Sequence, residues 1–445
     1  MQHMSADFSA ATARKAVHPF LFTILVLPMG VALGYVQVTL AYVLSDAGVS
    51  VPQIAAVVAA SVLPHIFKFL WAPLVDTTLT FKKWFWISGV ASSLVLMAMS
   101  LLPLTEANLP LLTLGIYAYH FFITFSAMAA EGLMAYEVPA ELHGRAAGYF
   151  QIGNLGGTGI GGGLGLLLAQ RLPTPGAAGI VLGVLCLGCC LALVAFRDQT
   201  TTIRAARIGD TYRAMGRDVW ETVRTKSGWL ALLACVLPLG TAAAAGLWSA
   251  VAKDWGAGAD TVALVTGVLG GLVSALGCLV GGWTCDRLNP RYAYLLFGLG
   301  AAACLVGMAY APRTETVFIV GTLLYALANG TCYASFTAFT LEAIGKGAAV
   351  TKYNLFASLS NSPAYLLMYV LGFAYARFGA RGMLNTEAAF AVGAVVFFLV
   401  LQQTVLRNKI PRWRKQVAAP AEAALLPLAV AGYEMSRRSA VAPAV

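Results

Sequence analysis

His65, Lys68 and Asp76 place an imidazole, an ammonium and a carboxylate in and at the end of one apolar stretch of this 445-residue sequence. At about 100° per residue, helical positions 65 and 76 differ in direction by about 20°, and position 68 lies about 60° to the side. One helical stripe would therefore hold all three groups. Groups of these kinds bind and release protons, so the spacing indicates proton chemistry inside an apolar environment.

His120 and Glu131 form a second stripe of this kind, because positions 120 and 131 again differ by about 20°. A charge at the centre of a bilayer costs about 2.5–3.5 kcal/mol or more, so each charge needs a partner or a task. We expect the histidines near the middle of the membrane, and Lys68 and Glu131 closer to the cytoplasm as an ion pair. Proton coupling is assigned to Glu131, His65, Lys68 and His120, with Glu131 as the principal candidate. The alternatives are that Lys68 snorkels to the interface and that the histidines only pack and form hydrogen bonds.

Neutral polar side chains occupy single faces of other apolar stretches. Gln151 and Asn154 share one helical face. Asn354, Ser358 and Asn361 share another. Amides and hydroxyls suit hydrogen bonding to a sugar or a peptide amide, and the alternative is that they only join helices. The predicted substrate cavity comprises Tyr35, Gln37, Gln151, Asn154, Trp248, Asn329, Tyr353, Asn354, Ser358 and Asn361.

Apolar helices must position these residues, because 59% of the chain is hydrophobic and 11% is charged. A soluble globular domain carries about 25% charged residues. Apolar stretches of about 20 residues, each long enough to cross a hydrocarbon core of about 30 Å, recur along the whole chain. We predict an all-α membrane protein with transmembrane helices at 18–44, 53–75, 84–104, 110–135, 145–169, 176–196, 228–250, 261–284, 292–311, 317–341, 349–376 and 384–406.

The second half of the chain repeats landmarks of the first half in the same order, about 210 positions later. Val-Leu-Pro-Met-Gly at 26–30 returns as Val-Leu-Pro-Leu-Gly at 236–240. Asp76, which closes one apolar run, corresponds to Asp286, which closes another. Two homologous halves of six helices share one orientation, which is the layout of a transporter whose substrate binds between the halves.

The longest polar stretch separates these halves. It carries seven basic and four acidic residues and falls between the sixth and seventh apolar stretches. The predicted domains are an N-terminal six-helix bundle at 1–196, a basic cytoplasmic linker at 197–227, a C-terminal six-helix bundle at 228–410 and a cytoplasmic tail at 411–445.

Two loops resemble a known family. Residues 282–291 read Gly-Trp-Thr-Cys-Asp-Arg-Leu-Asn-Pro-Arg and resemble the Gly-x-x-x-Asp-Arg-x-x-x-Arg signature of the major facilitator superfamily. Residues 67–76, with Lys82-Lys83-Trp84, resemble the branch of AmpG-like muropeptide permeases and acetyl-coenzyme A transporters. The resemblance implies twelve transmembrane helices in two pseudo-repeat bundles that work by alternating access. The sequence departs from the branch in two ways: no arginine follows Asp76, and Glu131 replaces the paired aspartates.

An aspartate at the cytoplasmic end of a helix can pair with basic residues and neighbouring helix ends in one conformation only, so it would act as a latch. The alternative is a loop charge that only orients its helix. The predicted cytoplasmic gate comprises Asp76, Lys82, Lys83, Asp286, Arg287 and Arg291.

Basic residues are distributed unequally between the two sides. With a cytoplasmic N-terminus, the cytoplasmic side holds 23 Lys and Arg residues and the opposite side holds 5. The positive-inside rule therefore predicts a multi-pass protein of the bacterial inner membrane with both termini in the cytoplasm. The net charge of +10 follows from this asymmetry, so we expect no nucleic-acid partner. The eight cysteines show no metal-ligand spacing, and no cofactor is expected.

These features predict a monomeric secondary transporter that takes up a polar organic solute, muropeptide-like or an amino sugar, together with protons. Its expected partners are this small-molecule substrate, the proton and the lipid bilayer. The alternatives are an exporter of amphipathic compounds and an importer of another solute, such as a siderophore or a CoA-like molecule. An intramembrane enzyme would need an activated nucleophile or metal ligands, which the sequence does not indicate, so we expect no enzyme activity.

Overall fold

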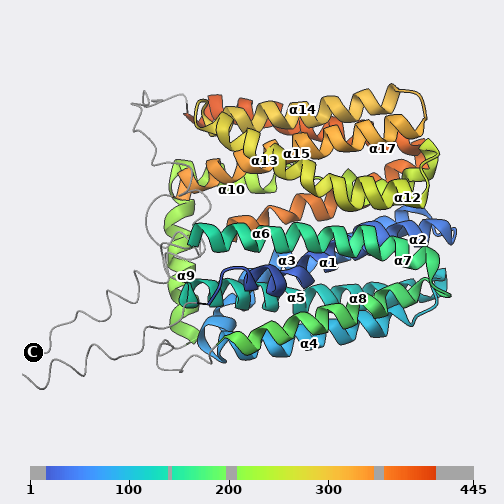
Figure 1. Cartoon of the computed structure of the whole chain (residues 1–445). Coiled ribbons are helices and arrows are strands. Elements are labelled where there is room, and N and C mark those ends of the chain that lie inside the picture. Colours follow the sequence, from blue (N-terminus) through green and yellow to red (C-terminus); the bar gives the residue numbers. More distant parts are fainter. Residues whose placement is uncertain (1–16, 139–142, 197–207, 345–354, 407–445) are drawn as a thin grey trace, which may run out of the picture.

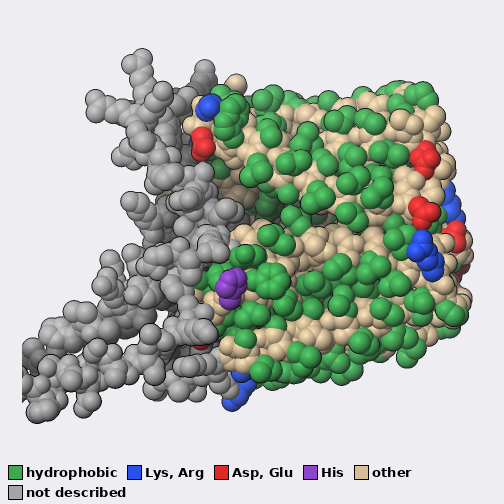
Figure 2. Space-filling model, in the orientation of Figure 1, with side chains coloured by type: hydrophobic (Ala, Val, Ile, Leu, Met, Phe, Trp, Pro, Cys, Tyr) green, Lys and Arg blue, Asp and Glu red, His purple; other side chains and the backbone are tan. Residues whose placement is uncertain are grey.

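The computed structural model describes residues 17–138, 143–196, 208–344 and 355–406 (Figure 1). All regular elements within these ranges are helices, which confirms the predicted all-α fold. Hydrophobic side chains cover the middle of the face drawn in Figure 2, and charged side chains lie toward its two ends. This distribution is that of a helix bundle whose middle is surrounded by hydrocarbon.

The first half of the chain forms six spans, several of which are helical segments joined end to end. These are α1 (Leu21–Gly34), the π-helical η1 (Tyr35–Leu40) and α2 (Ala41–Asp46); α3 (Val51–Thr77); α4 (Phe81–Ser100); the short η2 (Glu106–Asn108) leading into α5 (Leu109–Glu137); α6 (His143–Gly159), the π-helical η4 (Ile160–Leu164) and α7 (Gly165–Arg171); and α8 (Gly176–Cys189) with η5 (Cys190–Ala195).

The second half follows the same plan after the connecting helix α9 (Ile208–Val223). Its elements are α10 (Lys226–Val236), η7 (Ala244–Leu247), α11 (Trp248–Val251) and η8 (Ala252–Trp255); α12 (Ala259–Val262), the π-helical η9 (Ala263–Leu269) and α13 (Gly270–Cys285); α14 (Pro290–Tyr310); α15 (Glu315–Ile344); and α17 (Asn361–Leu406).

Local sequence signals set where several helices begin. Ser50 and Gln53 form a capping box before α3, in which the Gln53 carboxamide accepts a hydrogen bond from the Ser50 backbone N–H. The Thr80 hydroxyl caps α4 by accepting from the Lys83 backbone N–H at 3.2 Å. Asn289 caps α14 immediately before Pro290, which is the preferred place for proline in a helix.

Nine helical stretches of the described residues are long and apolar enough to cross a membrane. One of them, Leu355–Gln403, contains two spans, because Gly379 adopts a left-handed backbone (φ 63°) within α17. The helix α4 has a similar length, and residues 226–255 form a further span that is broken in its middle. Counted in this way, the described residues form the twelve predicted spans.

The two halves form two adjacent bundles. In Figure 1 the blue-to-green elements pack together below, the yellow-to-red elements pack above, and α9 lies across one end of both. We call this end of the molecule the α9 end, and the end where Asp46 lies the far end. The Tyr212 hydroxyl donates a hydrogen bond to the Leu70 carbonyl, which fastens α9 to α3.

The span 226–255 is not the continuous helix predicted at 228–250. The helix α10 ends at Val236, and Leu237 has an extended backbone (φ −77°, ψ 137°). A residue before proline avoids the helical region, and Pro238 lacks the backbone N–H that would continue the helix. Gly240 and Ala242 then adopt left-handed backbone conformations with φ of 62° and 53°. The corresponding Pro28 of the first half lies inside α1. The two copies of the Leu-Pro-x-Gly motif therefore have different structures.

The halves pack closely where η4 meets η9. A Cβ atom added to Gly267 would lie 2.6 Å from the backbone nitrogen of Gly163. Such a distance is shorter than any real Cβ contact, so only glycine fits at position 267 without a shift of backbone. The π-helical η1 lies against both segments. In η1 the Thr39 hydroxyl donates to the Gly161 carbonyl at 2.8 Å.

Candidate functional site

His65 and His120 lie side by side between α3 and α5. Nε2 of His65 and Nδ1 of His120 are 3.3 Å apart, and the ring of His120 is 1% exposed. One nitrogen of the contact must donate and the other must accept, so the neutral pair has one proton between the rings. Protonating both rings would place two positive charges in contact in a poorly hydrated environment. The pair can therefore take up at most one additional proton.

Lys68 lies one helical turn from His65 on α3, whereas Asp76 and Glu131 lie eleven residues, about 16 Å, further along α3 and α5. Lys68 and Asp76 are charged groups that act electrostatically on Glu131. The expected direct ion pair is absent, because neither ion pair within 4.0 Å among the described residues joins Lys68 to Glu131. Trp71 holds the helices together here, since its indole N–H donates to the Thr124 hydroxyl at 2.9 Å. The sequence stripes on 53–75 and 110–135 thus face each other, with the charges close but not in contact.

The cavity residues predicted in the first half lie in different environments. Tyr35 is buried in η1, and its hydroxyl lies 3.3 Å from the Ser100 hydroxyl. Gln37 and Asn154 are half-buried, and Gln151 is exposed on α6. Tyr35 therefore has a partner within its own half.

Two of the cavity residues predicted in the second half meet at Tyr325. The ring of Trp248 contacts the ring of Tyr325 edge-on with centroids 5.6 Å apart. The Asn329 amide donates to the Tyr325 backbone carbonyl at 3.0 Å, while its oxygen Oδ1 is buried without a hydrogen-bond partner among the described residues.

The remaining candidates of this half lie near the start of α17. The Ser358 hydroxyl is buried, and the Asn361 amide donates to the Ala357 carbonyl at 2.9 Å. The candidates Tyr353 and Asn354 lie outside the described residues.

Glu387 is a buried carboxylate in α17 that the sequence prediction missed. It is 4% exposed, and it accepts hydrogen bonds from the Tyr325 hydroxyl at 2.7 Å and the Ala244 backbone N–H at 2.9 Å. The Thr241 hydroxyl contributes a longer contact of 3.3 Å. The sequence did contain a signal, because Glu387 is an acid inside the predicted span 384–406. A charge inside a span is costly and needs a partner or a task, as was argued for Glu131.

The gate residues predicted at the α9 end lie in several different environments. Lys82 donates to the Phe196 carbonyl at 2.6 Å, within the first half. Lys83 and Asp286 are exposed. The guanidinium of Arg287 lies 3.6 Å from the centroid of the Trp283 ring.

The other two gate residues also lie at this end. The guanidinium of Arg291 lies over the Phe339 ring at 5.3 Å, within the second half. Asp76 lies at the end of α3. The contacts of Lys82 with Phe196, of Arg287 with Trp283 and of Arg291 with Phe339 each join residues of the same half.

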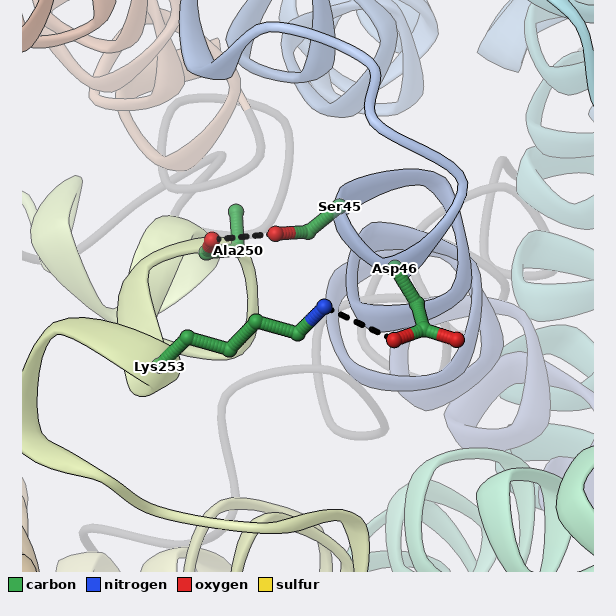
Figure 3. A network of polar contacts seen from close by, with 4 residues as sticks. All are labelled: Ser45, Asp46, Ala250 and Lys253. Atoms are coloured by element: carbon green, nitrogen blue, oxygen red, sulfur yellow. Dashed lines mark hydrogen bonds and ion pairs between the residues drawn. The ribbon is translucent and has the colours of Figure 1, made fainter.

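Two polar contacts join the halves at the far end. Lys253 of η8 and Asp46 of α2 form an ion pair at 2.7 Å, and the Ser45 hydroxyl donates to the Ala250 carbonyl at 2.7 Å (Figure 3). Both contacts join the first half to the second. Nearby, the Tyr375 hydroxyl donates to the Asp254 carboxylate at 2.9 Å. Together with the contact of η4 and η9, these bonds join the halves at the far end, as expected of one state of an alternating-access cycle.

A cavity of about 390 Å³ opens beside the break in the span 226–255. Its lining is formed by Leu237, Pro238 and apolar residues of α17 between 389 and 397. It contains none of the predicted cavity residues and offers no polar side chain to a solute, so we do not assign substrate binding to it.

Comparisons with known proteins agree with this architecture. A model of the Major Facilitator Superfamily matches residues 20–364. Anhydromuropeptide permease of Escherichia coli strain K12 is 26% identical over 360 residues, which cover 78% of this chain and 72% of that protein. The predicted resemblance to the muropeptide permease branch is thereby confirmed.

Solved structures show the same fold. The nucleoside transporter NupG has a TM-score of 0.67 at 12% identity, over 86% of this chain and 98% of that chain. A D-xylose-proton symporter has a TM-score of 0.64 at 14% identity, over 85% of this chain and 97% of that chain. Because the family model spans more than half of the sequence and its relatives are permeases, the protein is a membrane transporter rather than an enzyme, and the chain belongs to the major facilitator superfamily.

Proposed function

We propose that this transporter imports a muropeptide-like or amino-sugar solute together with protons. Secondary transport of an organic solute follows from the family. The observation that carries the proton coupling is the set of ionisable groups between α3 and α5, namely the histidine pair and, toward the α9 end, Lys68 and Glu131. Ionisable groups within a membrane span are costly, and they commonly form proton pathways.

The substrate class is supported by the similarity to anhydromuropeptide permease. Muropeptides combine sugar hydroxyls with peptide amides, and both need donors and acceptors on the protein. Asn154 on α6, Asn329 on α15 and Asn361 on α17 supply both from different helices. We assign these amides to substrate contact, together with Gln37 and Trp248.

Glu131 is the residue that we assign to coupling. Its carboxylate shares its surroundings with the cation Lys68 and the anion Asp76. Protonation of Glu131 would leave Lys68 and Asp76 as the remaining charges of the group. The electrostatic balance between α3 and α5 then changes, and these helices carry the charges that lie toward the α9 end. The histidine pair, about 16 Å further along the same helices, supplies a second site for one proton in transit.

The contacts at the far end bear on which side of the membrane this state faces. The bonds at Asp46 and Ser45 close that end, so this state would exchange solute at the α9 end. We assign the α9 end to the cytoplasm, because the polar loops and segments predicted there carry most of the basic residues. In the opposite state, the exposed Asp286 and Lys83 would be available to latch the α9 end.

The test is uptake by vesicles reconstituted with the purified full chain. The panel comprises anhydromuropeptides, amino sugars, CoA esters and siderophores, each with and without an imposed gradient that is acidic outside. We expect accumulation of a muropeptide or an amino sugar that depends on the gradient. Accumulation of the same solute without a gradient would reject proton coupling, and movement of CoA esters or siderophores alone would reject the substrate class.

The substitution Glu131→Gln tests the coupling residue. It should abolish gradient-driven accumulation and preserve exchange of labelled for unlabelled solute, because exchange needs no net proton movement. The control is Glu106→Gln, which neutralises an exposed carboxylate in η2 and should leave both activities unchanged. Gradient-driven accumulation in the Glu131→Gln variant would exclude Glu131 as the coupling residue.

A further inference from the structure

Glu387 is held by hydrogen-bond donors from two other spans. Its Oε1 atom accepts from the Tyr325 hydroxyl of α15 at 2.7 Å and lies 3.3 Å from the Thr241 hydroxyl. Its Oε2 atom accepts from the backbone N–H of Ala244 at 2.9 Å. Thr241 lies in the break of the span 226–255, and Ala244 is the first residue after the break. The carboxylate therefore ties the broken span to α15 and α17.

The surroundings of Glu387 provide donors and no counter-charge. Neither ion pair among the described residues includes Glu387. The titratable groups that face the break from neighbouring helices are uncharged types, namely Tyr294 of α14 and Tyr325 and Cys332 of α15. On its own helix the nearest cation is Arg381, whose guanidinium bonds to the Ala309 carbonyl. An anionic Glu387 is thus stabilised by hydrogen bonds alone.

These donors determine where a proton can bind. The partner of Oε2 is a backbone N–H, which can only donate, so it offers no acceptor to a proton bound at Oε2. The partners of Oε1 are hydroxyls, which can rotate and accept instead. A proton therefore binds at Oε1 and is donated to the oxygen of Tyr325.

The structure also contains an acceptor for the displaced Tyr325 hydrogen. Oδ1 of Asn329 is buried without a partner among the described residues, one helical turn from Tyr325 on α15. The Asn329 side chain lies against Tyr325, since its amide N–H donates to the Tyr325 backbone carbonyl at 3.0 Å. The ring of Tyr325 contacts Trp248, which follows the break. Glu387 is thus linked through Tyr325 to two residues assigned to the substrate cavity, to Asn329 by polar groups and to Trp248 by a ring contact.

We propose that Glu387 is a second proton-binding site of this transporter, connected through Tyr325 to Asn329 and Trp248. Binding of the proton weakens the bond from Ala244 to Oε2, because a neutral carboxyl oxygen accepts less strongly than an ionised one. Protonation then loosens the break and the segment that carries Trp248. Only the use of this site in transport depends on the proposed proton coupling, and proton binding itself can be measured without a substrate.

Infrared difference spectroscopy of the full chain during a pH titration tests proton binding directly. A carboxyl band that appears on acidification should be lost in Glu387→Gln and retained in the matched variant Glu131→Gln. The variant Tyr325→Phe should move the midpoint of the same band, and it provides the test should Glu387→Gln fail to fold. A spectrum that is the same in wild type, Glu387→Gln and Tyr325→Phe would overturn the proposal.

Hydrogen–deuterium exchange then tests the link to the break. At a pH where the band shows Glu387 to be ionised, peptides covering 237–247 should exchange faster in Glu387→Gln than in wild type. At a pH where Glu387 is protonated, the two proteins should exchange alike. A difference that persists at both pH values would identify a permanently charged structural anchor and refute the proposal. Uptake that proves independent of protons would refute the proposed coupling, while leaving a titrating Glu387 in place.

Discussion

Replacing Gly267 by alanine should disrupt the contact between η4 and η9 and open the far end. The added Cβ would lie 2.6 Å from the backbone nitrogen of Gly163, so backbone must move. Overpacking of this kind costs about 1–3 kcal/mol, which changes an equilibrium constant by about 5- to 150-fold. The state that is closed at the far end should lose population by a factor in this range.

The matched control is Gly271→Ala, which lies one turn further along the same span. Its Cβ would contact only the Leu155 side chain, at an ordinary 3.7 Å. Both substitutions gain the same helix propensity of about 1 kcal/mol, which is present in both states and cancels. Gly271→Ala should therefore leave the balance between the states unchanged.

The assay is the distance between spin labels at the far end. Labels at the exposed positions Ala47 and Asp260, in a background whose eight native cysteines are replaced, report the separation of the two halves. We expect a second, longer distance to gain population in Gly267→Ala only. The reasoning is refuted if Gly267→Ala retains the wild-type distance distribution, or if Gly271→Ala changes it equally.

Three further predictions concern smaller effects. Lys253→Met should raise the population of the state open at the far end by no more than about fivefold, because an exposed ion pair such as that with Asp46 contributes about 0–1 kcal/mol. The same spin-label distance measures this population. A larger coupling in a double-mutant cycle with Asp46→Asn would contradict the prediction. Thr39→Val should lower the free energy of unfolding by about 1 kcal/mol, and Thr39→Ser should retain the wild-type value, because the serine hydroxyl can still donate to the Gly161 carbonyl. Thermal melting measures both variants. Equal melting temperatures of the two variants would contradict a contribution from this hydrogen bond. Ala242→Gly should raise the melting temperature, because it relieves a left-handed backbone that costs a non-glycine residue about 1–2 kcal/mol. The control Ala243→Gly, at φ −62°, should lower the melting temperature. Shifts of the same sign would contradict the left-handed conformation of Ala242.

The apolar length of the spans was sufficient to predict their number and the all-α fold. The stripe argument also placed His65 and His120 on faces that meet, because angular position on a regular helix follows from spacing alone. Spacing does not determine the distance between two side chains, and Lys68 and Glu131 were predicted to touch but do not. Their separation depends on how α3 and α5 pack, which is a tertiary property.

The break in the span 226–255 shows the limit of the repeat argument. The Leu-Pro-x-Gly motif occurs in both halves, yet α1 continues through Pro28 and α10 ends before Pro238. Part of the difference lies in Glu387, whose carboxylate accepts the Ala244 N–H just after the break. A partner more than a hundred residues away cannot be identified from the motif itself. For this reason both the break and the role of Glu387 were missing from the prediction.

The π-helical segments η1, η4 and η9 have a consequence for how sequences of this kind are aligned. A π-helical turn holds more residues than an α-helical turn and commonly occurs as a bulge within an α-helix. Removing one residue from 160–164 would convert η4 to α-helix and rotate all of α7 by about 100° relative to α6. Two relatives that differ by one such residue would keep the same twelve spans while presenting different side chains at their interfaces. A gap inside a span of this chain is thus a structural event, and it should not be moved into a loop during alignment.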